Sequence, residues 1–462
     1  MNDTVLAIDI GSTKISAVIA NINEGKVQVM GHGVADAQGI KKGIITNIEQ
    51  ASKSIKNALN DAKRVSGANM TTAIVSISNA YAKSISSNGI VNLPNHEISL
   101  KEINRVMQTA LYNAKIPEEY EVIHVLPYNF TVDEQNFVED PYGMNASRLE
   151  VDVNIIMSQK SNLSNLKRAV RSAGVEIDGI VLSGYASSIS VLEPEDKARG
   201  VAVIDLGGQT SNLVVHVGNS IRYNDFLGVG SNHVTNDLSI ALHTPLHIAE
   251  VVKLDYANLL GYEDEIIQLP IIGDEENTND VSLEVVYNVV FARVEETLMI
   301  LAQSLEKSNL TEHIKAGIIL TGGMSKIKGI KELAQSIFNG MPVRVAVPTN
   351  VDGISEDLKD SAFSAVIGLL RYRAGEHTPY EIDFKQQLLH TKDEYKESLS
   401  DIQLTSDTQD SKLSGNDVKI ELANEHKVSR ESENITFDDL DELEGDDNGV
   451  IKKFSNWAKQ LF

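Results

Sequence analysis

Residues 5–14 read VLAIDIGSTK, and residues 201–212 read VAVIDLGGQTSN. In both stretches an apolar run of strand-forming residues ends in Asp-x-Gly, turns through small or hydroxyl-bearing residues, and enters a second β-rich run, at 15–20 and at 213–217. The pattern predicts the same β-hairpin twice. Glycines in such a turn let the backbone approach an anion and offer it N–H groups. The repeat therefore predicts a polyphosphate site built from two similar halves.

The candidate ligand-binding residues follow from these two turns. The first turn supplies Gly11, Ser12, Thr13 and Lys14, and the second supplies Gly207, Gly208, Gln209 and Thr210. One acid precedes each turn, and we expect both acids to hold, through water, a Mg²⁺ that bridges the phosphates: Asp9 and Asp205. A single glycine turn after a strand is more often only a tight hairpin, so the interpretation depends on several segments occurring together.

A third segment, residues 316–329, reads AGIILTGGMSKIKG and predicts a strand that ends before a helix at 330–338. We expect Gly322, Gly323 and Met324 to form a flat backbone surface for a purine. A fourth element is the pair Glu250 and Lys253, three residues apart on one face of a predicted helix. Without the other three segments, this pair would be interpreted as an ordinary surface ion pair.

The doubled hairpin and the strand–Gly-Gly–helix segment resemble the phosphate-1, phosphate-2 and adenosine motifs of the actin, heat-shock chaperone and sugar-kinase superfamily. Within it, the segments GIKKG at 39–43, HVLP at 124–127 and LSGYASS at 182–188, together with the C-terminus, resemble the bacterial cell-division family FtsA. The resemblance implies an α/β actin-like fold of two domains. Each is a five-stranded sheet of mixed direction with helices packed on it, and ATP with Mg²⁺ lies between them. It also implies that Glu250 and Lys253 contact the ribose and adenine.

The resemblance divides the chain into parts. The expected limits are 1–82 and 163–197 for the first domain, 83–162 for an inserted α+β subdomain that takes part in filament contacts, and 198–380 for the second domain, with a return to the first near 361–374. A mostly helical subdomain at 231–314 is expected to bind the C-terminal tail of the division protein FtsZ. Arg293, on a predicted helix at 283–306, is a candidate contact, and a solvated helix face is the alternative.

The C-terminal region differs in composition from the rest of the chain. Residues 381–449 carry a net charge of −13 with few large apolar residues, which predicts a disordered acidic linker. Residues 450–462, VIKKFSNWAKQLF, place bulky apolar groups on one helical face beside three lysines, which predicts a membrane-surface anchor. The residues expected at the lipid are Ile451, Lys452, Lys453, Phe454, Trp457, Lys459, Leu461 and Phe462. The alternatives are docking on the protein's own body or in a partner's groove.

Composition limits the remaining possibilities. The 462-residue chain has no cysteine, which excludes disulfides and thiolate metal sites. Its net charge of −24, without a basic stripe in the body, argues against nucleic acid as a partner. His243 and His247 share a helix face, but no third ligand accompanies them, so we expect no metal site there. Without a signal peptide or an apolar run long enough to span a bilayer, the chain is expected to stay in the cytoplasm.

The resemblance implies a function. We expect an ATP-binding protein that polymerises on the cytoplasmic face of the membrane at the division site, tethers FtsZ there and recruits later division proteins. Gln209 stands where relatives often have glycine and Asn212 where they often have an acid. The helix at 183–190 has no Glu, Gln or His to orient water, so we expect slow or negligible hydrolysis. The alternatives are an actin-fold ATPase or small-molecule kinase, and the pilus-assembly adaptor of the same superfamily.

Overall fold

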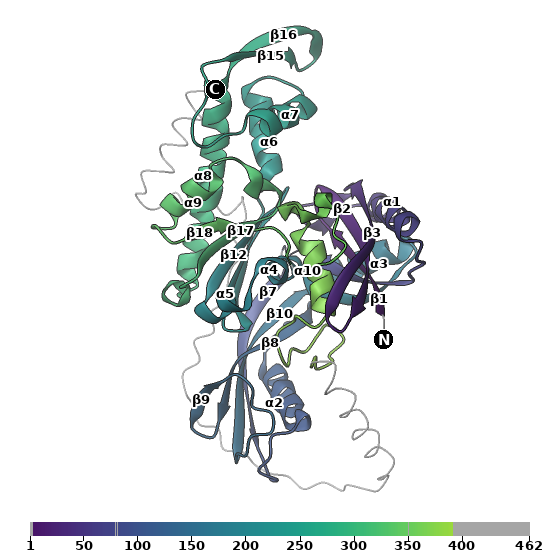
Figure 1. The fold of residues 1–462 in the computed structure, drawn as a ribbon, viewed down its shortest axis with the longest axis vertical. Helices are drawn as coiled ribbons and strands as arrows, with labels where there is room; N and C mark the ends of the chain where they lie inside the picture. Colours follow the sequence, from purple (N-terminus) through teal and green to yellow (C-terminus); the bar gives the residue numbers. More distant parts are fainter. Residues whose placement is uncertain (1–2, 79, 81, 350, 391–462) are drawn as a thin grey trace.

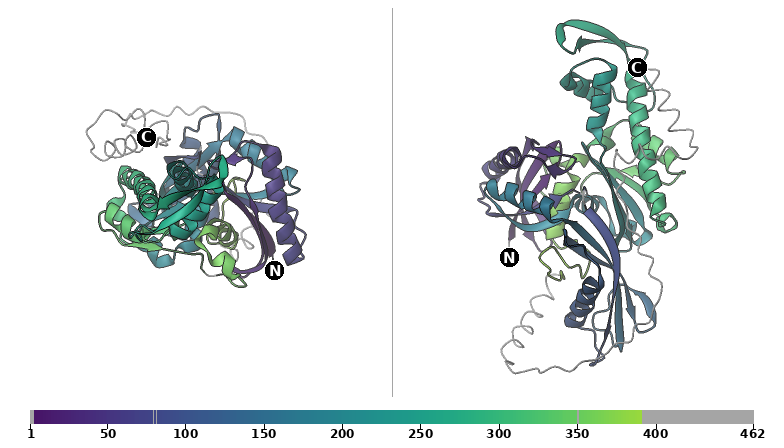
Figure 2. Two further views of the ribbon diagram at one scale, coloured as in Figure 1. Left: turned by 90° about the horizontal axis from the view of Figure 1, so that it is seen from above. Right: turned by 180° about the vertical axis from the view of Figure 1, so that it is seen from behind.

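The computed structural model describes residues 3–390, except 79, 81 and 350. The predicted anchor helix at 450–462, and all of the predicted linker beyond residue 390, lie outside the described residues. Two five-stranded sheets lie next to each other in the middle of an elongated molecule (Figure 1). A four-stranded subdomain and a mainly helical subdomain lie at opposite ends of the long axis, as the view from behind in Figure 2 also shows.

The first domain is built on the sheet β11-β6-β1-β2-β3. Its strands are β1 (Asp3–Ile10), β2 (Lys14–Asn23), β3 (Lys26–Asp36), β6 (Thr72–Ile77) and β11 (Glu176–Leu182). Strand β1 runs antiparallel to β2 and parallel to β6, so the sheet is mixed, as predicted. Helices α1 (Ile48–Ser66), α3 (Lys160–Ser172) and α10 (Ser364–Arg373) complete the domain. Helix α1 approaches β3 closely because β3 carries glycine: a Cβ on Gly33 would lie 2.2 Å from the Ala58 carbonyl oxygen.

The second domain repeats this arrangement with the sheet β14-β13-β12-β17-β18. Its strands are β12 (Val201–Leu206), β13 (Ser211–Val217), β14 (Ser220–Leu227), β17 (Gly317–Thr321) and β18 (Val343–Val345). Strand β12 is antiparallel to β13 and parallel to β17, which corresponds to β1 between β2 and β6. The two hairpins predicted from the sequence are therefore confirmed, in matching places in the two sheets.

The helices of the second domain are α5 (Pro194–Arg199), α6 (Ser231–Ala241), α7 (Leu246–Tyr256), α8 (Leu283–Lys307) and α9 (Ile330–Ile337). Helices α6, α7 and α8 pack on one another and extend away from the sheet, whereas α5 contacts β13 and α9 contacts β18 (Figure 1). Between α7 and α8 the chain forms an antiparallel hairpin, β15 (Ile266–Ile271) with β16 (Asp274–Ser282), which the sequence did not predict. The residues of β16, DEENTNDVS, are mostly poor strand formers, so periodicity gave no signal for it.

The inserted subdomain is an antiparallel sheet, β7-β10-β8-β9, covered by α2 (Leu100–Asn113). Its strands are β7 (Ala82–Asn92), β8 (Tyr120–Val132), β9 (Gln135–Val138) and β10 (Arg148–Gln159). The helix and sheet share an apolar core that includes Ile103 and Val153. The subdomain also contacts the second domain, where the Asn154 side-chain amide donates to the Ile221 carbonyl oxygen at 3.2 Å. The predicted α+β insertion is present.

Two helices lie where the two halves meet. Helix α4 (Ser183–Val191) leads from the first sheet toward the second, and α10 packs against both α4 and β1. Their backbones approach so closely that a Cβ on Gly368 would lie 1.7 Å from the Ala186 carbonyl oxygen. A short hairpin, β4 (Ile40–Lys41) with β5 (Ile44–Ile45), adds a small loop at the edge of the first domain.

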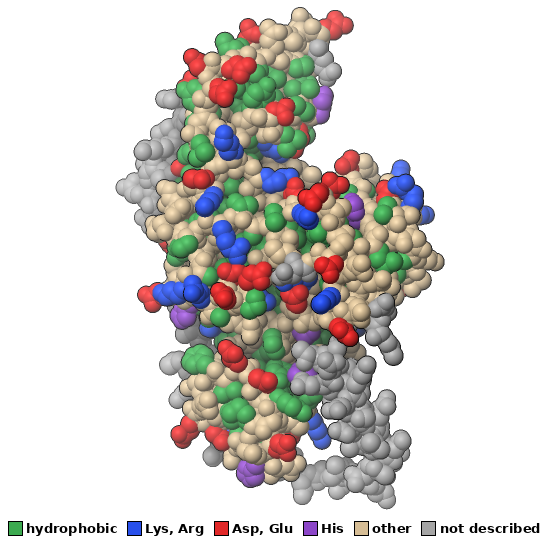
Figure 3. Space-filling view, viewed as in Figure 1, with side chains coloured by type: hydrophobic (Ala, Val, Ile, Leu, Met, Phe, Trp, Pro, Cys, Tyr) green, Lys and Arg blue, Asp and Glu red, His purple; other side chains and the backbone are tan. Residues whose placement is uncertain are grey.

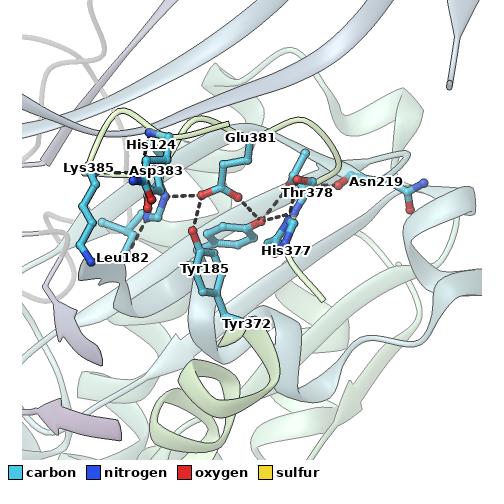
Figure 4. A network of polar contacts seen from close by, with 11 residues as sticks. His124, Leu182, Tyr185, Asn219, Tyr372, His377, Thr378, Glu381, Asp383 and Lys385 are labelled. Atoms are coloured by element: carbon cyan, nitrogen blue, oxygen red, sulfur yellow. Dashed lines mark hydrogen bonds and ion pairs between the residues drawn. The ribbon is translucent and has the colours of Figure 1, made fainter. Parts of the chain in front are cut away.

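The sequence predicted a disordered acidic linker that begins at residue 381. This prediction is wrong for residues 381–390, which belong to the packed structure. The Glu381 carboxylate is fully buried and accepts hydrogen bonds from the Tyr185 hydroxyl at 3.0 Å and the Tyr372 hydroxyl at 2.8 Å (Figure 4). His124 Nδ1 lies 2.6 Å from the same carboxylate. Because the Leu182 N–H donates to His124 Nε2, the ring proton is on Nδ1 and points to Glu381.

The backbone holds this segment as well. Ile382 and Val125 exchange two backbone hydrogen bonds, of 2.9 and 3.0 Å, so the segment pairs with β8 of the insertion. Acid-rich composition predicts disorder only where acids lack partners, and two of the partners of Glu381, His124 and Tyr185, are distant in sequence.

Candidate functional site

The turns of the two hairpins have the same backbone design. In the first, Ile10 pairs with Ile15 across four residues, and in the second Leu206 pairs with Ser211 across four residues. A Cβ on Gly11 would lie 2.7 Å from the Lys14 carbonyl oxygen, and a Cβ on Gly207 would lie 2.8 Å from that of Thr210. Each turn therefore needs glycine first, because the carbonyl of its fourth residue folds back onto that position.

The two turns touch each other across the space between the domains. A Cβ on Gly208 would lie 1.7 Å from Thr13 Oγ1, so only glycine fits at this contact. Beside the contact lies a cavity of about 210 Å³. It is lined by eleven of the residues predicted for the ligand: Asp9, Gly11, Ser12, Thr13, Lys14, Asp205, Gly207, Gly208, Thr210, Gly322 and Gly323. The fold thus brings the three predicted glycine segments to one place.

Other lining residues were not predicted. They are Ile10, Gly43, Ser78, Ser183, Asn212, Ser231, Ser361, Ala362 and Ala365. Most are small or carry a hydroxyl, and they come from elements that only the tertiary fold brings together. Gly43 and Ser183 belong to the segments 39–43 and 182–188, which resemble the family. That resemblance was the signal that could have indicated these two residues.

Both acids predicted to serve the metal are partly buried in the cavity wall. The Ser76 hydroxyl donates to Asp9 at 2.7 Å, and the Ser187 hydroxyl donates to Asp205 at 2.6 Å. Burial raises the pKa of Asp9, and burial, with a further contribution from Asp9, raises the pKa of Asp205 to about 6. Two partly buried carboxylates that repel each other favour a shared cation, which would offset both the desolvation and the repulsion.

Lys14 supplies the cation of the cavity wall. Its ammonium lies 3.1 Å from the centre of the Phe363 ring. Burial lowers the pKa of Lys14 to about 8, although the nearby Asp9, Asp360 and Asp205 oppose the shift. An anionic ligand group would stabilise the charged form of this lysine.

The third segment presents an open backbone surface. Gly322 has a φ of 85°, and a Cβ there would lie 2.3 Å from Asp205 Oδ1. The hydroxyls of Ser325 and Ser361 donate to the Gly322 carbonyl oxygen and hold the turn. A Cβ on Gly323 would instead meet only the Ala362 Cβ, at 3.7 Å. Gly323 is therefore the position where the wall is free to receive a flat group.

Four predicted ligand residues do not line the cavity. Met324 is 1% exposed and packs in the core of the second domain. Glu250 and Lys253 form the predicted pair on α7, with 2.7 Å between Oε2 and Nζ, and both also contact the Thr235 hydroxyl. Gln209 points to the β4–β5 loop instead. Roles for these residues in ligand binding stay predictions.

Arg293 does not lie on a solvated helix face. Its side chain is 11% exposed and bridges two helices, with contacts of 2.6 Å to Asp237 on α6 and 2.5 Å to Glu296 on α8. A contact with an acidic peptide would have to compete with these two carboxylates, and it stays a prediction.

The residues present fit a Mg²⁺–nucleotide. Asn212 lines the cavity, and its side-chain oxygen is buried and has no hydrogen-bond partner within the described residues. This oxygen can therefore accept a hydrogen bond from a ligand or a water, or coordinate a cation. Asp9 and Asp205 would hold the waters of the metal ion, the two glycine turns and Lys14 would receive the phosphates, and Gly323 would face the base. When bound, the metal ion would neutralise phosphate charge.

Two mixed five-stranded sheets with matching hairpins, a cleft between them and an inserted subdomain define an actin-like protein. Comparison with protein-family models agrees with this class. Residues 79–157 match the model of the SHS2 domain inserted in FtsA, and residues 202–368 match the model of cell division protein FtsA.

Known proteins give the same result. The chain is 40% identical over 426 residues to cell division protein FtsA of Helicobacter pylori, covering 85% of this chain and 86% of the relative. It is 34% identical over 372 residues to that of Pseudomonas aeruginosa, covering 80% and 88%. The chain therefore belongs to the FtsA family of cell division proteins. A solved PilM–PilN type IV pilus biogenesis complex, at 19% identity with a TM-score of 0.57 over 80% of this chain and 98% of that chain, shares only the fold.

Proposed function

We propose that this protein binds ATP with Mg²⁺ in the cleft between its two domains. The observation that carries the proposal is the convergence of both hairpin turns and the Gly322–Gly323 segment on one cavity. The two partly buried acids, the cationic Lys14 and the open backbone at Gly323 complement the metal, the phosphates and the base, respectively.

We further propose that it polymerises on the cytoplasmic face of the membrane at the division site. There it tethers FtsZ and recruits later division proteins. Membership of the FtsA family supports this role, and the sequence of residues 450–462 supports attachment to anionic lipid. Within the part of the chain that the structure describes, no helix is both long and apolar enough to cross a bilayer.

The proposed surface for the FtsZ tail lies on the helical end of the second domain. Large apolar side chains are exposed along α7 and the loop after it, where Figure 3 shows hydrophobic groups gathered: Leu246, Val251, Leu254, Tyr256 and Leu260. An exposed patch of several large apolar side chains favours binding of a peptide that carries apolar side chains.

Turnover is expected to be slow. Helix α4, which borders the cavity at Ser183, has the sequence SGYASSISV and provides no carboxylate, amide or imidazole to orient a water molecule. The alternative of an actin-fold ATPase or small-molecule kinase is tested by phosphate release, alone and with candidate acceptors. A turnover above about 1 s⁻¹, the low end of typical enzymes, would favour that alternative.

The test of the proposed function is co-sedimentation with anionic vesicles. Because one short helix binds lipid weakly, assembly into filaments should increase attachment steeply through avidity, by about 10²–10⁴. We expect ATP to raise the lipid-bound fraction cooperatively, and an FtsZ tail peptide to co-sediment. Trp457→Ala should abolish lipid binding while leaving binding of the peptide intact. A hyperbolic lipid-binding curve that ATP does not alter would contradict the proposal.

A further inference from the structure

The small β4–β5 hairpin has a rigid tip. Its two turn residues, Lys42 with a φ of 48° and Gly43 with a φ of 76°, are both left-handed, as a two-residue hairpin loop of this type requires. A Cβ on Gly43 would lie 2.1 Å from Ser78 Oγ, so the tip sits directly against the end of the first sheet. The position of its two backbone N–H groups is therefore fixed.

These two N–H groups point to opposite domains. The Gly43 N–H donates to Ser12 Oγ in the first turn at 2.7 Å, and the Lys42 N–H donates to Gln209 Oε1 in the second turn at 2.8 Å. The bond from Lys42 to Gln209 thus joins a loop of the first domain to the second domain.

Gln209 and Thr13 are equivalent residues of the two hairpins. Each is the third of the four residues that separate the last paired positions of its strands. The Thr13 hydroxyl abuts Gly208 of the opposite turn, and the Gln209 side chain reaches Lys42 of the opposite domain. A glycine at position 209 would have no side chain to accept this bond, so the contact is specific to the residue present.

We propose that Gln209 is a positioning residue that holds the cleft closed and slows the release of bound nucleotide. This inference rests on the proposed nucleotide binding. The cavity is lined by the turns of both domains, and the bond between Lys42 and Gln209 joins those domains beside it. A movement that separates the two domains to release the ligand would have to break this bond.

Two measurements on the full chain test the inference. The first is the release rate of a fluorescent ATP analogue, which Gln209→Leu should increase about two- to tenfold, the effect of one lost hydrogen bond. The second uses spin labels on cysteines introduced at the exposed Lys56 and Asp255, which is straightforward in a cysteine-free chain. Without nucleotide, Gln209→Leu should lengthen and broaden the distance between the labels across the cleft.

The controls separate the bond from general effects of substitution. Gln209→Glu keeps an acceptor of the same length and should retain the closed distance, while Gln268→Leu, the same change as Gln209→Leu on the exposed strand β15, should alter neither measurement. An unchanged distance in Gln209→Leu would overturn the inference even if nucleotide binds. If the wild type binds no nucleotide, the proposed function fails. An altered distance would then support only the closing contact, and the role in nucleotide release would be overturned.

Discussion

The hairpin turns of the two domains share a backbone but differ in their side chains. Position by position they pair as Gly11 with Gly207, Ser12 with Gly208, Thr13 with Gln209, and Lys14 with Thr210. The first turn carries the buried cation, and the second carries the additional glycine that lets the turns touch. The repeated backbone thus sets the geometry of the cleft, while the residues that differ between the turns divide its chemistry between the domains.

The largest effect is expected from the buried network around Glu381, whose acceptor contacts are with Tyr185, Tyr372 and His124. Glu381→Ala would leave the hydroxyls of Tyr185 and Tyr372 and the N–H of His124 without their acceptor, at a cost of about 3–5 kcal/mol of unfolding free energy. Hydrogen exchange should accelerate in β6, β11 and the insertion, and less in β12 and β17. Equal acceleration in both sheets would show that the network does not stabilise the first domain selectively.

The next largest effect is expected from substitutions at the second residue of each turn, Gly208 and Ser12. Gly208→Ala places a methyl group 1.7 Å from Thr13 Oγ1 and forces the turns apart, so affinity for Mg²⁺–ATP should fall about 100-fold, the size of effect that a 1 Å misplacement can have on the rate of an active site. Ser12→Ala, at the matching position, removes the acceptor for the Gly43 N–H and one hydroxyl of the cavity wall without a clash, and should cost about tenfold or less. Titration calorimetry measures both. A larger loss of affinity in Ser12→Ala than in Gly208→Ala would show that the close contact between Gly208 and Thr13 does not control binding.

The pH dependence of binding should show one limb from each turn. Affinity for Mg²⁺–ATP should fall as pH drops through about 6, where Asp205 becomes protonated, by about tenfold per pH unit. It should also fall as pH rises through about 8, where Lys14 loses its proton. Asp205→Asn should flatten the acid limb alone, and Lys14→Met the alkaline limb alone.

The same shift of Asp205 affects folding stability. Its pKa is raised above the usual 3.8, so its contribution to stability is complete below pH 3.8 and is lost as pH rises through about 6. The difference in unfolding free energy between Asp205→Asn and the wild type should therefore shift in favour of the variant from pH 4 to pH 8. Thermal unfolding at the two pH values measures the difference, and an identical difference at both would contradict the shift.

The smallest effect concerns the base. Substituting Gly322 would strain a backbone with φ of 85° and collide with Asp205, so it would disrupt the turn itself. Gly323→Ala is cleaner because its Cβ meets only Ala362 at 3.7 Å. We expect a loss of about three- to tenfold in affinity for ATP, from crowding of the base, and none for inorganic tripolyphosphate. Equal losses for both ligands would place the base elsewhere.

The features that the sequence predicted are those encoded locally. The hairpins, their glycines and the order of the three segments can be recognised in short stretches of chain, and they led to eleven residues of the cavity wall. Contacts between distant segments could not be recognised in this way. The bond from Lys42 to Gln209 and the burial of Glu381 depend on how the domains pack. The ion pair between Arg293 and Asp237 joins two helices that are far apart in the sequence, so the sequence alone did not show that Arg293 is shielded from solvent.

Calorimetric titration of the wild-type protein with Mg²⁺–ATP measures whether both turns form one nucleotide site, because a cleft between them accepts a single ligand. We expect one nucleotide per chain, with binding severely weakened by Gly208→Ala in one turn and by Lys14→Met in the other. Two nucleotides per chain, or full affinity in either variant, would contradict it.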